Sequence, residues 1–236
     1  MNQIPILDHG YISLIETWGS DERIIEAARM STAKGFQGWG SIHDQGCSKP
    51  GDEKLLRYLW EHKHATPFEM AGAVFEIQAP IFVFREWHRH RTQSYNEMSA
   101  RYTPLPNVNY IPTVERLFVN SKSNKQAGTI KGSIELTEES ALEYQTLLSE
   151  MYEEQEELYQ FALQSGVSKE IARIHLPVGR YSRMRASANL RNWLAFLILR
   201  MDQAAQWEIR QYANAVCDLL SSIFPRTVAL FLEGVK

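Results

Sequence analysis

The stretch from Arg85 to Arg101 gathers side chains that bind anions or transfer protons. It contains four arginines and two histidines, with hydroxyl, amide and carboxylate side chains among them. The planar guanidinium group matches a phosphate, and it also matches the paired carbonyl oxygens at the edge of a uracil or isoalloxazine ring. Between Arg89 and Arg101 only three residues are apolar, too few for the stripe of a core helix or strand: Tyr95, Met98 and Ala100. The composition indicates an anion-binding site, although ordinary charge on a solvated helix end would explain it equally well.

Histidines raise a second kind of chemistry, because two His-x-His pairs could contribute metal ligands. The pairs are His62 with His64 and His88 with His90. No carboxylate or cysteine at a matching spacing completes a zinc site or a triad of two histidines and one carboxylate. We therefore expect no metal, and the end of a helix explains His62.

The elements that would position these residues are short strands among dominant helices. Residues 73–79 alternate, with Phe75 and Ile77 on one face, and residues 181–188 alternate in the same way. A further strand is expected within residues 3–16. Two segments are typical of long loops, namely residues 34–51 and 103–135. This mixture predicts an α+β fold in which a small central sheet packs against long helices.

The helices are predicted from capping residues and apolar stripes. Ser20, Thr137, Ser168 and Asn189 each stand where an N-cap belongs, and Pro80 suits the first turn of a helix. The helices that we expect span residues 21–30, 53–63, 81–90, 138–164, 169–173, 190–200 and 204–222. The one candidate linker, residues 120–136, does not divide the chain, so we expect residues 1–236 to form a single domain.

Composition excludes several classes of protein. The net charge of -3 is too close to neutral for a protein that coats nucleic acid, so no nucleic-acid partner is expected. The N-terminal sequence lacks the features of a signal peptide, and apolar runs such as residues 193–199 are too short to span a membrane. Cys47 and Cys217 are far apart and form no disulfide framework, which favours a cytoplasmic location.

The order of residues within the polar run carries more information than its composition. Residues 89–102 are RHRTQSYNEMSARY, and this pattern, R-H-R-x-x-S-x-N-E-x-S-x-R-Y, resembles the signature of the flavin-dependent thymidylate synthases, the ThyX proteins. Other segments are similar to that family: AARMS at 27–31, HKHATPFEM at 62–70, IARIHLPVGR at 171–180, and ANLRNWLAFLILRMDQAAQWEIR at 188–210. The resemblance covers nearly the whole chain and implies the ThyX fold.

The resemblance implies two sets of binding residues. FAD would be bound by Ser31, His64, Thr66, Arg89, His90, Arg91, Glu97, Asn189 and Arg191, with Glu69 nearby as a support. The pyrimidine nucleotide would be bound by Glu86, Trp87, His88, Arg89, Glu97, Met98, Ser99, Ala100, Arg101, Tyr102, Arg173 and Arg200. Arg200 is also the implied catalytic residue, which ionises the base at N3. A cation at that edge would stabilise the enolate that makes C5 nucleophilic.

The sequence departs from the family pattern at three positions. Ala195 and Ala204 stand where many members have an asparagine and a histidine, so one flavin contact and one active-site histidine are absent. Glu86 replaces a glutamine that is common just before the Arg-His-Arg segment. The family's contact at this position is to ribose or phosphate.

The activity implied is reductive methylation of dUMP to dTMP, with 5,10-methylenetetrahydrofolate as carbon donor, FAD as hydride carrier and NADPH as reductant. In the family, FAD lies between the subunits of a homotetramer. The absence of a G-x-G-x-x-G segment after a strand fits a flavin bound outside a Rossmann domain. Neither cysteine lies near the arginine-rich segments, which fits a route without a thiolate nucleophile. Two alternatives remain open: a related flavin enzyme that methylates UMP or a modified nucleotide, and a non-catalytic RNA-binding module.

Overall fold

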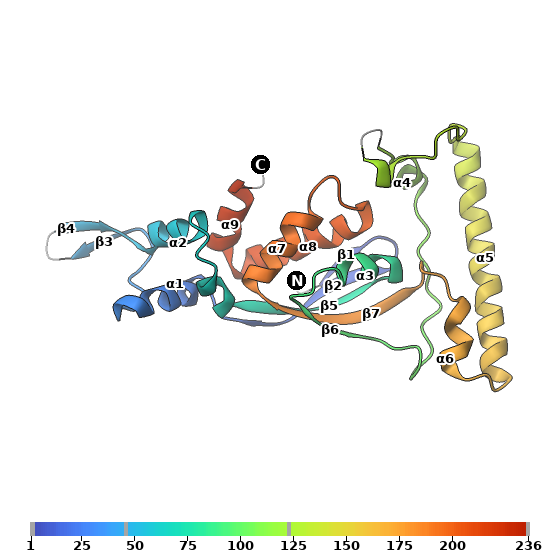
Figure 1. Ribbon diagram of the computed structural model, residues 1–236, viewed down its shortest axis with the longest axis horizontal. Coiled ribbons are helices and arrows are strands. Elements are labelled where there is room, and N and C mark those ends of the chain that lie inside the picture. Colours follow the sequence, from blue (N-terminus) through green and yellow to red (C-terminus); the bar gives the residue numbers. More distant parts are fainter. Residues whose placement is uncertain (1–2, 45–46, 122–123, 235–236) are drawn as a thin grey trace.

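The computed structural model describes residues 3–44, 47–121 and 124–234. Five strands form one antiparallel sheet in the order β1-β2-β5-β7-β6 (Figure 1). The strands are β1 Gln3–Ile6, β2 Gly10–Trp18, β5 Gly72–Pro80, β6 Ser94–Glu97 and β7 Tyr181–Asn189. A separate hairpin pairs β3 Ser41–Asp44 with β4 Cys47–Pro50.

Helices make up most of the remaining structure, as the sequence predicts for an α+β fold. The longer helices are α1 Asp21–Arg29, α2 Asp52–Glu61, α3 Ile81–Trp87, α5 Glu138–Gln164, α7 Leu190–Arg200, α8 Trp207–Ile223 and α9 Pro225–Gly234. The shorter ones are α4 Val114–Phe118, α6 Lys169–Ala172, and the 3-10 turns η1 Met30–Thr32, η2 Thr66–Met70, η3 Lys125–Ala127 and η4 Arg173–His175. No helix within the described ranges is both long and apolar enough to cross a membrane.

The core lies between one face of the sheet and the helices α3, α7 and α8 (Figure 1). Phe75 and Ile77 point into it and are fully buried, which confirms the alternation predicted for β5. The indole N–H of Trp193 on α7 donates to the Ala73 carbonyl at 3.0 Å, so this large side chain has its polar group satisfied. On the opposite face of the sheet, Glu76 accepts a hydrogen bond from the Tyr11 hydroxyl at 3.0 Å.

Three of the predicted caps are confirmed by hydrogen bonds. Ser20 accepts from the Arg23 backbone N–H, and Asn189 accepts from the Asn192 backbone N–H. Thr137 and Ser140 form a reciprocal capping box at the start of α5. Ser168 also precedes a helix, but its side chain makes no capping bond.

Several sequence expectations were wrong in detail. Residues 3–16 form a hairpin and not one strand, and residues 34–51 contain the β3–β4 hairpin where a loop was expected. The polar run contains the edge strand β6, whose backbone pairs with β7 between Ser94 and Ser187. An edge strand needs no apolar stripe, since backbone hydrogen bonds hold it. Pro225 begins the helix α9, because proline is well suited to a first helical position.

Candidate active site

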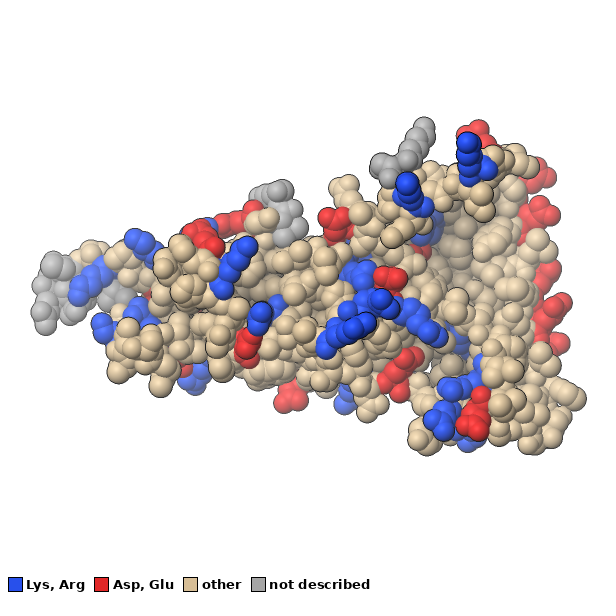
Figure 2. All heavy atoms as spheres, viewed as in Figure 1, with Lys and Arg blue, Asp and Glu red and all other residues tan. Residues whose placement is uncertain are grey.

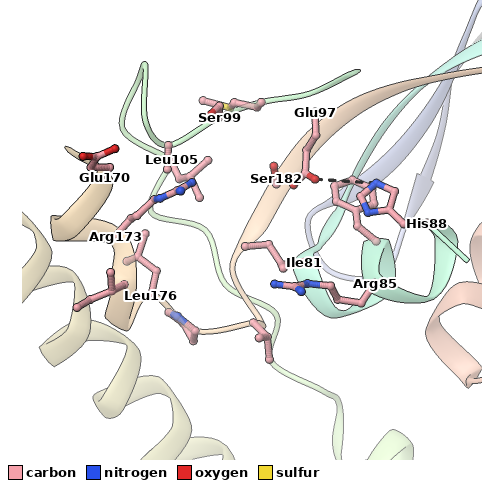
Figure 3. A pocket seen from close by; sticks show the side chains of 16 residues that line it. Ile81, Arg85, His88, Glu97, Ser99, Leu105, Glu170, Arg173, Leu176 and Ser182 are labelled. Atoms are coloured by element: carbon pink, nitrogen blue, oxygen red, sulfur yellow. Dashed lines mark ion pairs between the residues drawn. The ribbon is translucent and has the colours of Figure 1, made fainter. Parts of the chain in front are cut away.

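A cavity of about 740 Å³ opens beside β6, between α3, the chain from β6 to Leu105, the α6–η4 segment and β7 (Figure 3). Its walls include six of the residues expected to bind the nucleotide: His88, Glu97, Met98, Ser99, Ala100 and Arg173. Arg173 is far from the others in the sequence, and the fold brings it to the same cavity. Space of this size is typical of small-molecule sites.

Pairing of β6 with β7 sets the position of the cavity wall formed by residues 97–99. Glu97 lies opposite Met184 in the register, and the Met98 backbone N–H donates to the Arg183 carbonyl at 2.7 Å. The Ser99 carbonyl then accepts from the backbone of Tyr102 at 3.0 Å, which turns the chain away from the sheet. The sheet edge therefore fixes the backbone of Glu97 to Ser99 against the cavity.

The carboxylate groups of the cavity already have partners. His88 Nε2 lies 4.0 Å from a Glu97 carboxylate oxygen, the pair drawn in Figure 3. Glu170 on α6 lies 3.5 Å from Nε of Arg101. Lys169 Nζ donates to the Tyr102 carbonyl at 2.9 Å, so α6 is tied to the loop that follows β6.

Arg200, the expected catalytic residue, lies in a different cavity of about 890 Å³. Its Nη1 and Nη2 donate to the side chain and the carbonyl of Glu86, each at 2.9 Å, and its Nε donates to His90 Nε2 at 2.8 Å. Among the described residues, none lines both this cavity and the one that contains Arg173. Within one chain, the structure does not bring Arg200 to the Arg173 cavity.

His90 is held in its neutral form. Burial lowers the pKa of its imidazole to about 4, and the neighbouring Arg200 guanidinium adds to the effect. A neutral ring is required for Nε2 to accept the Arg200 hydrogen bond. His90 thus orients Arg200 without adding a charge to its surroundings.

Four other expected nucleotide residues line neither cavity, namely Trp87, Arg89, Arg101 and Tyr102. Trp87 is fully buried, donates to Gln93 and stacks on Phe196 at 4.6 Å between ring centroids. Tyr102 is 80% exposed, and Arg101 is exposed with Glu170 as its partner. Their roles in binding stay predictions.

The residues expected to bind flavin lie mostly at another part of the molecule, where η2 packs against α1 and α7. Thr66 begins η2, Asn189 caps α7, and Arg191 forms an ion pair with Glu69 of η2. The Asn192 side-chain amide donates to the Thr92 carbonyl at 3.1 Å, so the first turn of α7 is bound to the Arg-His-Arg loop. Ser31 lies in η1 directly after α1, and His64 precedes η2.

This surface has donors that suit an anionic dinucleotide. Arg89 and Arg91 are exposed, and neither guanidinium has an ion pair or hydrogen bond among the residues that the structure describes. Lys and Arg side chains gather in the middle of the face shown in Figure 2, over the region of α3 and β6. Unpaired guanidinium groups match a diphosphate. Among the described side chains, no group of three His, Cys, Asp or Glu could hold a metal ion.

Three polar residues of the Arg173 cavity had no assigned role in the sequence interpretation: Arg85, Glu170 and Ser182. Arg85 belongs to the polar run, but nothing in the order of residues distinguished it from surface charge. Ser182 lies on β7, and only the pairing of β7 with β5 and β6 places it at the cavity. No local signal could have found it.

A helix-covered antiparallel sheet with an arginine-lined cavity at its β6 edge defines an α+β protein. The family model described as thymidylate synthase complementing protein matches residues 13–226. The chain is 39% identical over 230 residues to a flavin-dependent thymidylate synthase of Thermus thermophilus, covering 98% of this chain and 78% of that protein. It is 38% identical over 231 residues to the flavin-dependent thymidylate synthase of Thermosipho africanus, and the match covers 98% of this chain and 94% of that protein.

Solved structures agree with the sequence relatives. The UMP/dUMP methylase PolB from Streptomyces cacaoi, bound with 5-Br UMP, matches with a TM-score of 0.80 and 29% identity over 98% of this chain and 96% of that one. The same enzyme bound with 5-Br dUMP gives a TM-score of 0.80 and 31% identity over 98% and 97%. The chain therefore belongs to the flavin-dependent thymidylate synthases, and it is an enzyme of this methyltransferase family.

Proposed function

We propose that this enzyme converts dUMP to dTMP, with 5,10-methylenetetrahydrofolate as carbon donor, FAD as hydride carrier and NADPH as reductant. The observation that carries the proposal is the cavity in which Glu97, Ser99 and Arg173 meet. These residues come from distant segments, and each belongs to a segment that resembles the family. Names of the curated relatives support the same reaction.

In this proposal the cavity beside β6 binds the nucleotide. The Arg173 guanidinium offers two parallel donors to a phosphate group, and the Ser99 hydroxyl offers a neutral one. The His88–Glu97 pair stands at the α3 side of the cavity, where it can accept and donate hydrogen bonds. The cavity walls would exclude water from the bound base.

Arg200 acts on the pyrimidine in this proposal, so its separation from the Arg173 cavity calls for a second copy of the chain. We expect Arg200 of one subunit to face the nucleotide held by Arg173 of another, within the homotetramer expected for the family. The surroundings of Arg200 favour an interface, since Ile198 and Leu199 beside it are 52% and 60% exposed. Apolar side chains exposed together are typical of surfaces that bind a partner.

The surface around η2 would bind FAD. When bound, FAD supplies a hydride that completes the new methyl group. Arg89 and Arg91 would neutralise the diphosphate, while Thr66 and Asn189 would orient the ring through hydrogen bonds. The ion pair between Arg191 and Glu69 keeps this part of α7 against η2.

The position of Cys217 fits a route that needs no thiolate. Its side chain is buried on α8, outside the cavity that contains Arg173, and burial raises the pKa of the thiol. A buried thiol with a raised pKa is a poor nucleophile.

A second candidate is methylation of UMP as well as dUMP. The structural likeness to PolB, a UMP/dUMP methylase that binds 5-Br UMP, favours it. Turnover of dUMP and UMP at equal concentration separates the two candidates, because only the 2′ carbon differs. Membership of an enzyme family gives the RNA-binding alternative no support.

Purified protein tests the proposal directly. We expect the visible absorption bands of flavin, either as isolated or after addition of FAD, and formation of dTMP when dUMP, methylenetetrahydrofolate and NADPH are all present. Protein that binds no flavin and makes no methylated nucleotide from dUMP or UMP would contradict it.

A further inference from the structure

Two side chains in the Arg173 cavity have no partner and no assigned role. Arg85 reaches in from α3, and its guanidinium makes no ion pair or hydrogen bond within the described chain. Ser182 lies on β7, is 1% exposed, and its hydroxyl has no hydrogen-bond partner among the described residues. A buried hydroxyl without a partner is destabilising and uncommon, so it points to a ligand.

The cavity is lined by two arginines, Arg85 and Arg173, and by two carboxylates, Glu97 and Glu170. Glu97 is paired with His88 and Glu170 with Arg101. Neither carboxylate forms an ion pair with Arg85 or Arg173, and both guanidinium groups are unpaired among the described residues. Figure 3 shows Arg85 and Arg173 entering from different elements, with both guanidinium ends directed into the cavity.

We infer that Arg85 is a further substrate-binding residue that binds the 5′-phosphate of the nucleotide together with Arg173, and that Ser182 donates a hydrogen bond to the same ligand. This inference rests on the proposed function, since it assumes a nucleotide in this cavity. A phosphate monoester carries up to two negative charges near neutral pH, and two guanidinium groups can neutralise them with bidentate hydrogen bonds. A serine hydroxyl is a suitable neutral donor beside such a pair.

A carboxylate could be bound by the same guanidinium pair, and the folate co-substrate is one source of carboxylates. The nucleotide is favoured because the residues that share the cavity, Glu97 and Ser99, belong to the segment expected to bind the nucleotide. The two sources differ in a measurable way: loss of Arg85 should affect one co-substrate and leave the other unchanged.

The test compares Arg85→Gln, Arg85→Lys and Ser182→Ala with the wild-type enzyme loaded with FAD. We expect Arg85→Gln to weaken dUMP binding about tenfold, measured by calorimetric titration, and to raise the KM for dUMP more than it lowers kcat. Arg85→Lys should keep part of the affinity, because lysine has the same charge as arginine but lacks the paired donors of the guanidinium group. Added salt should weaken dUMP binding less in Arg85→Gln than in wild type, because one ion pair is gone. Ser182→Ala should weaken binding by a smaller factor, about threefold.

Arg23→Gln is the matched control, because Arg23 is an exposed helical arginine paired only with Glu26 and outside the cavity. Thermal melting of each variant establishes that it folds. If wild type binds dUMP and folded Arg85→Gln binds it equally well, the inference is overturned while the proposed function stands. A change confined to the folate KM also overturns it. If the wild-type protein binds no dUMP, both the inference and the proposed function are overturned.

Discussion

At the scale of single residues, the contact between Arg200 and His90 links the active site to pH. The His90 pKa is lowered from an ordinary value of 6.5 to about 4 in the folded chain. A group whose pKa is lower when folded binds a proton more readily when unfolded. Its contribution to stability is therefore complete above about pH 6.5 and is lost as the pH falls towards about 4. The size of this contribution is on the order of 2 kcal/mol.

We predict that His90→Gln removes this part of the pH dependence. Glutamine can still accept the Arg200 hydrogen bond, but it does not titrate between pH 4 and 6.5. The free energy of unfolding, measured with denaturant at several pH values, should fall less steeply below pH 6.5 in the variant than in wild type. His9→Gln, which changes an exposed histidine, should keep the wild-type slope. Equal slopes for His90→Gln and wild type would refute the prediction.

Site residues were predictable where a local pattern carried them. The order of residues 89–102 singled out Glu97 and Ser99, and the structure places both at one cavity with Arg173. The pattern could not separate Trp87, which packs in the core, from its exposed neighbours, because burial is decided by tertiary contacts. It missed Ser182 for the same reason, since only strand pairing places that residue.

At the scale of elements, capping chemistry explains why α5 begins where it does. Thr137 forms a capping box with Ser140, whereas Ser168 makes no side-chain bond at the start of α6. We predict that Thr137→Ala lowers the free energy of unfolding by about 1 kcal/mol. Ser168→Ala also removes a hydroxyl from the residue before a helix. It should change the free energy of unfolding by at most a few tenths of a kcal/mol. Equal losses in chemical denaturation would show that the capping box is not the cause.

We expect the ties between α6 and the loop after β6 to affect function more than stability. Arg101 and Glu170 are each 57% exposed, so their ion pair contributes little to folding. We predict that Glu170→Gln leaves the melting temperature unchanged and lowers the KM for dUMP up to about threefold, because Arg101 loses a competing carboxylate. Glu61→Gln, which removes an exposed carboxylate paired with Arg57, is the control for a general change of charge. An unchanged or higher KM for Glu170→Gln would count against the competition.

Elements with local signals were predicted well, and elements without them were not. Caps and stripes located α1, α5 and α7 within a residue or two. The strand β6 was missed because its pairing with β7 joins residues about ninety positions apart, and its polar side chains follow no buried pattern. The helix α9 was not predicted, and it begins at Pro225, a residue type that suits the first position of a helix.

At the scale of the whole molecule, one chain holds the expected nucleotide site in two parts. Arg173 and Ser99 line one cavity, Arg200 and Glu86 another, and the two share no residue. The helix α5 stands at one end of the elongated molecule (Figure 1), with exposed apolar side chains that include Leu147, Leu158 and Phe161. Exposed apolar surface and divided sites both favour an assembly in which subunits complete one another.

Mixing two inactive variants tests whether the site is shared. Arg173→Gln should abolish nucleotide binding in its cavity, and Arg200→Gln should abolish catalysis. Each variant expressed alone should therefore be nearly inactive. If Arg173 of one subunit and Arg200 of another build each site, co-expression of the two variants in equal amounts leaves about a quarter of the sites with both arginines. The mixed protein should then make dTMP at about a quarter of the wild-type rate, measured per subunit, while each variant expressed alone stays inactive. If both arginines of each site come from the same chain, no mixture recovers activity, and the shared site is excluded.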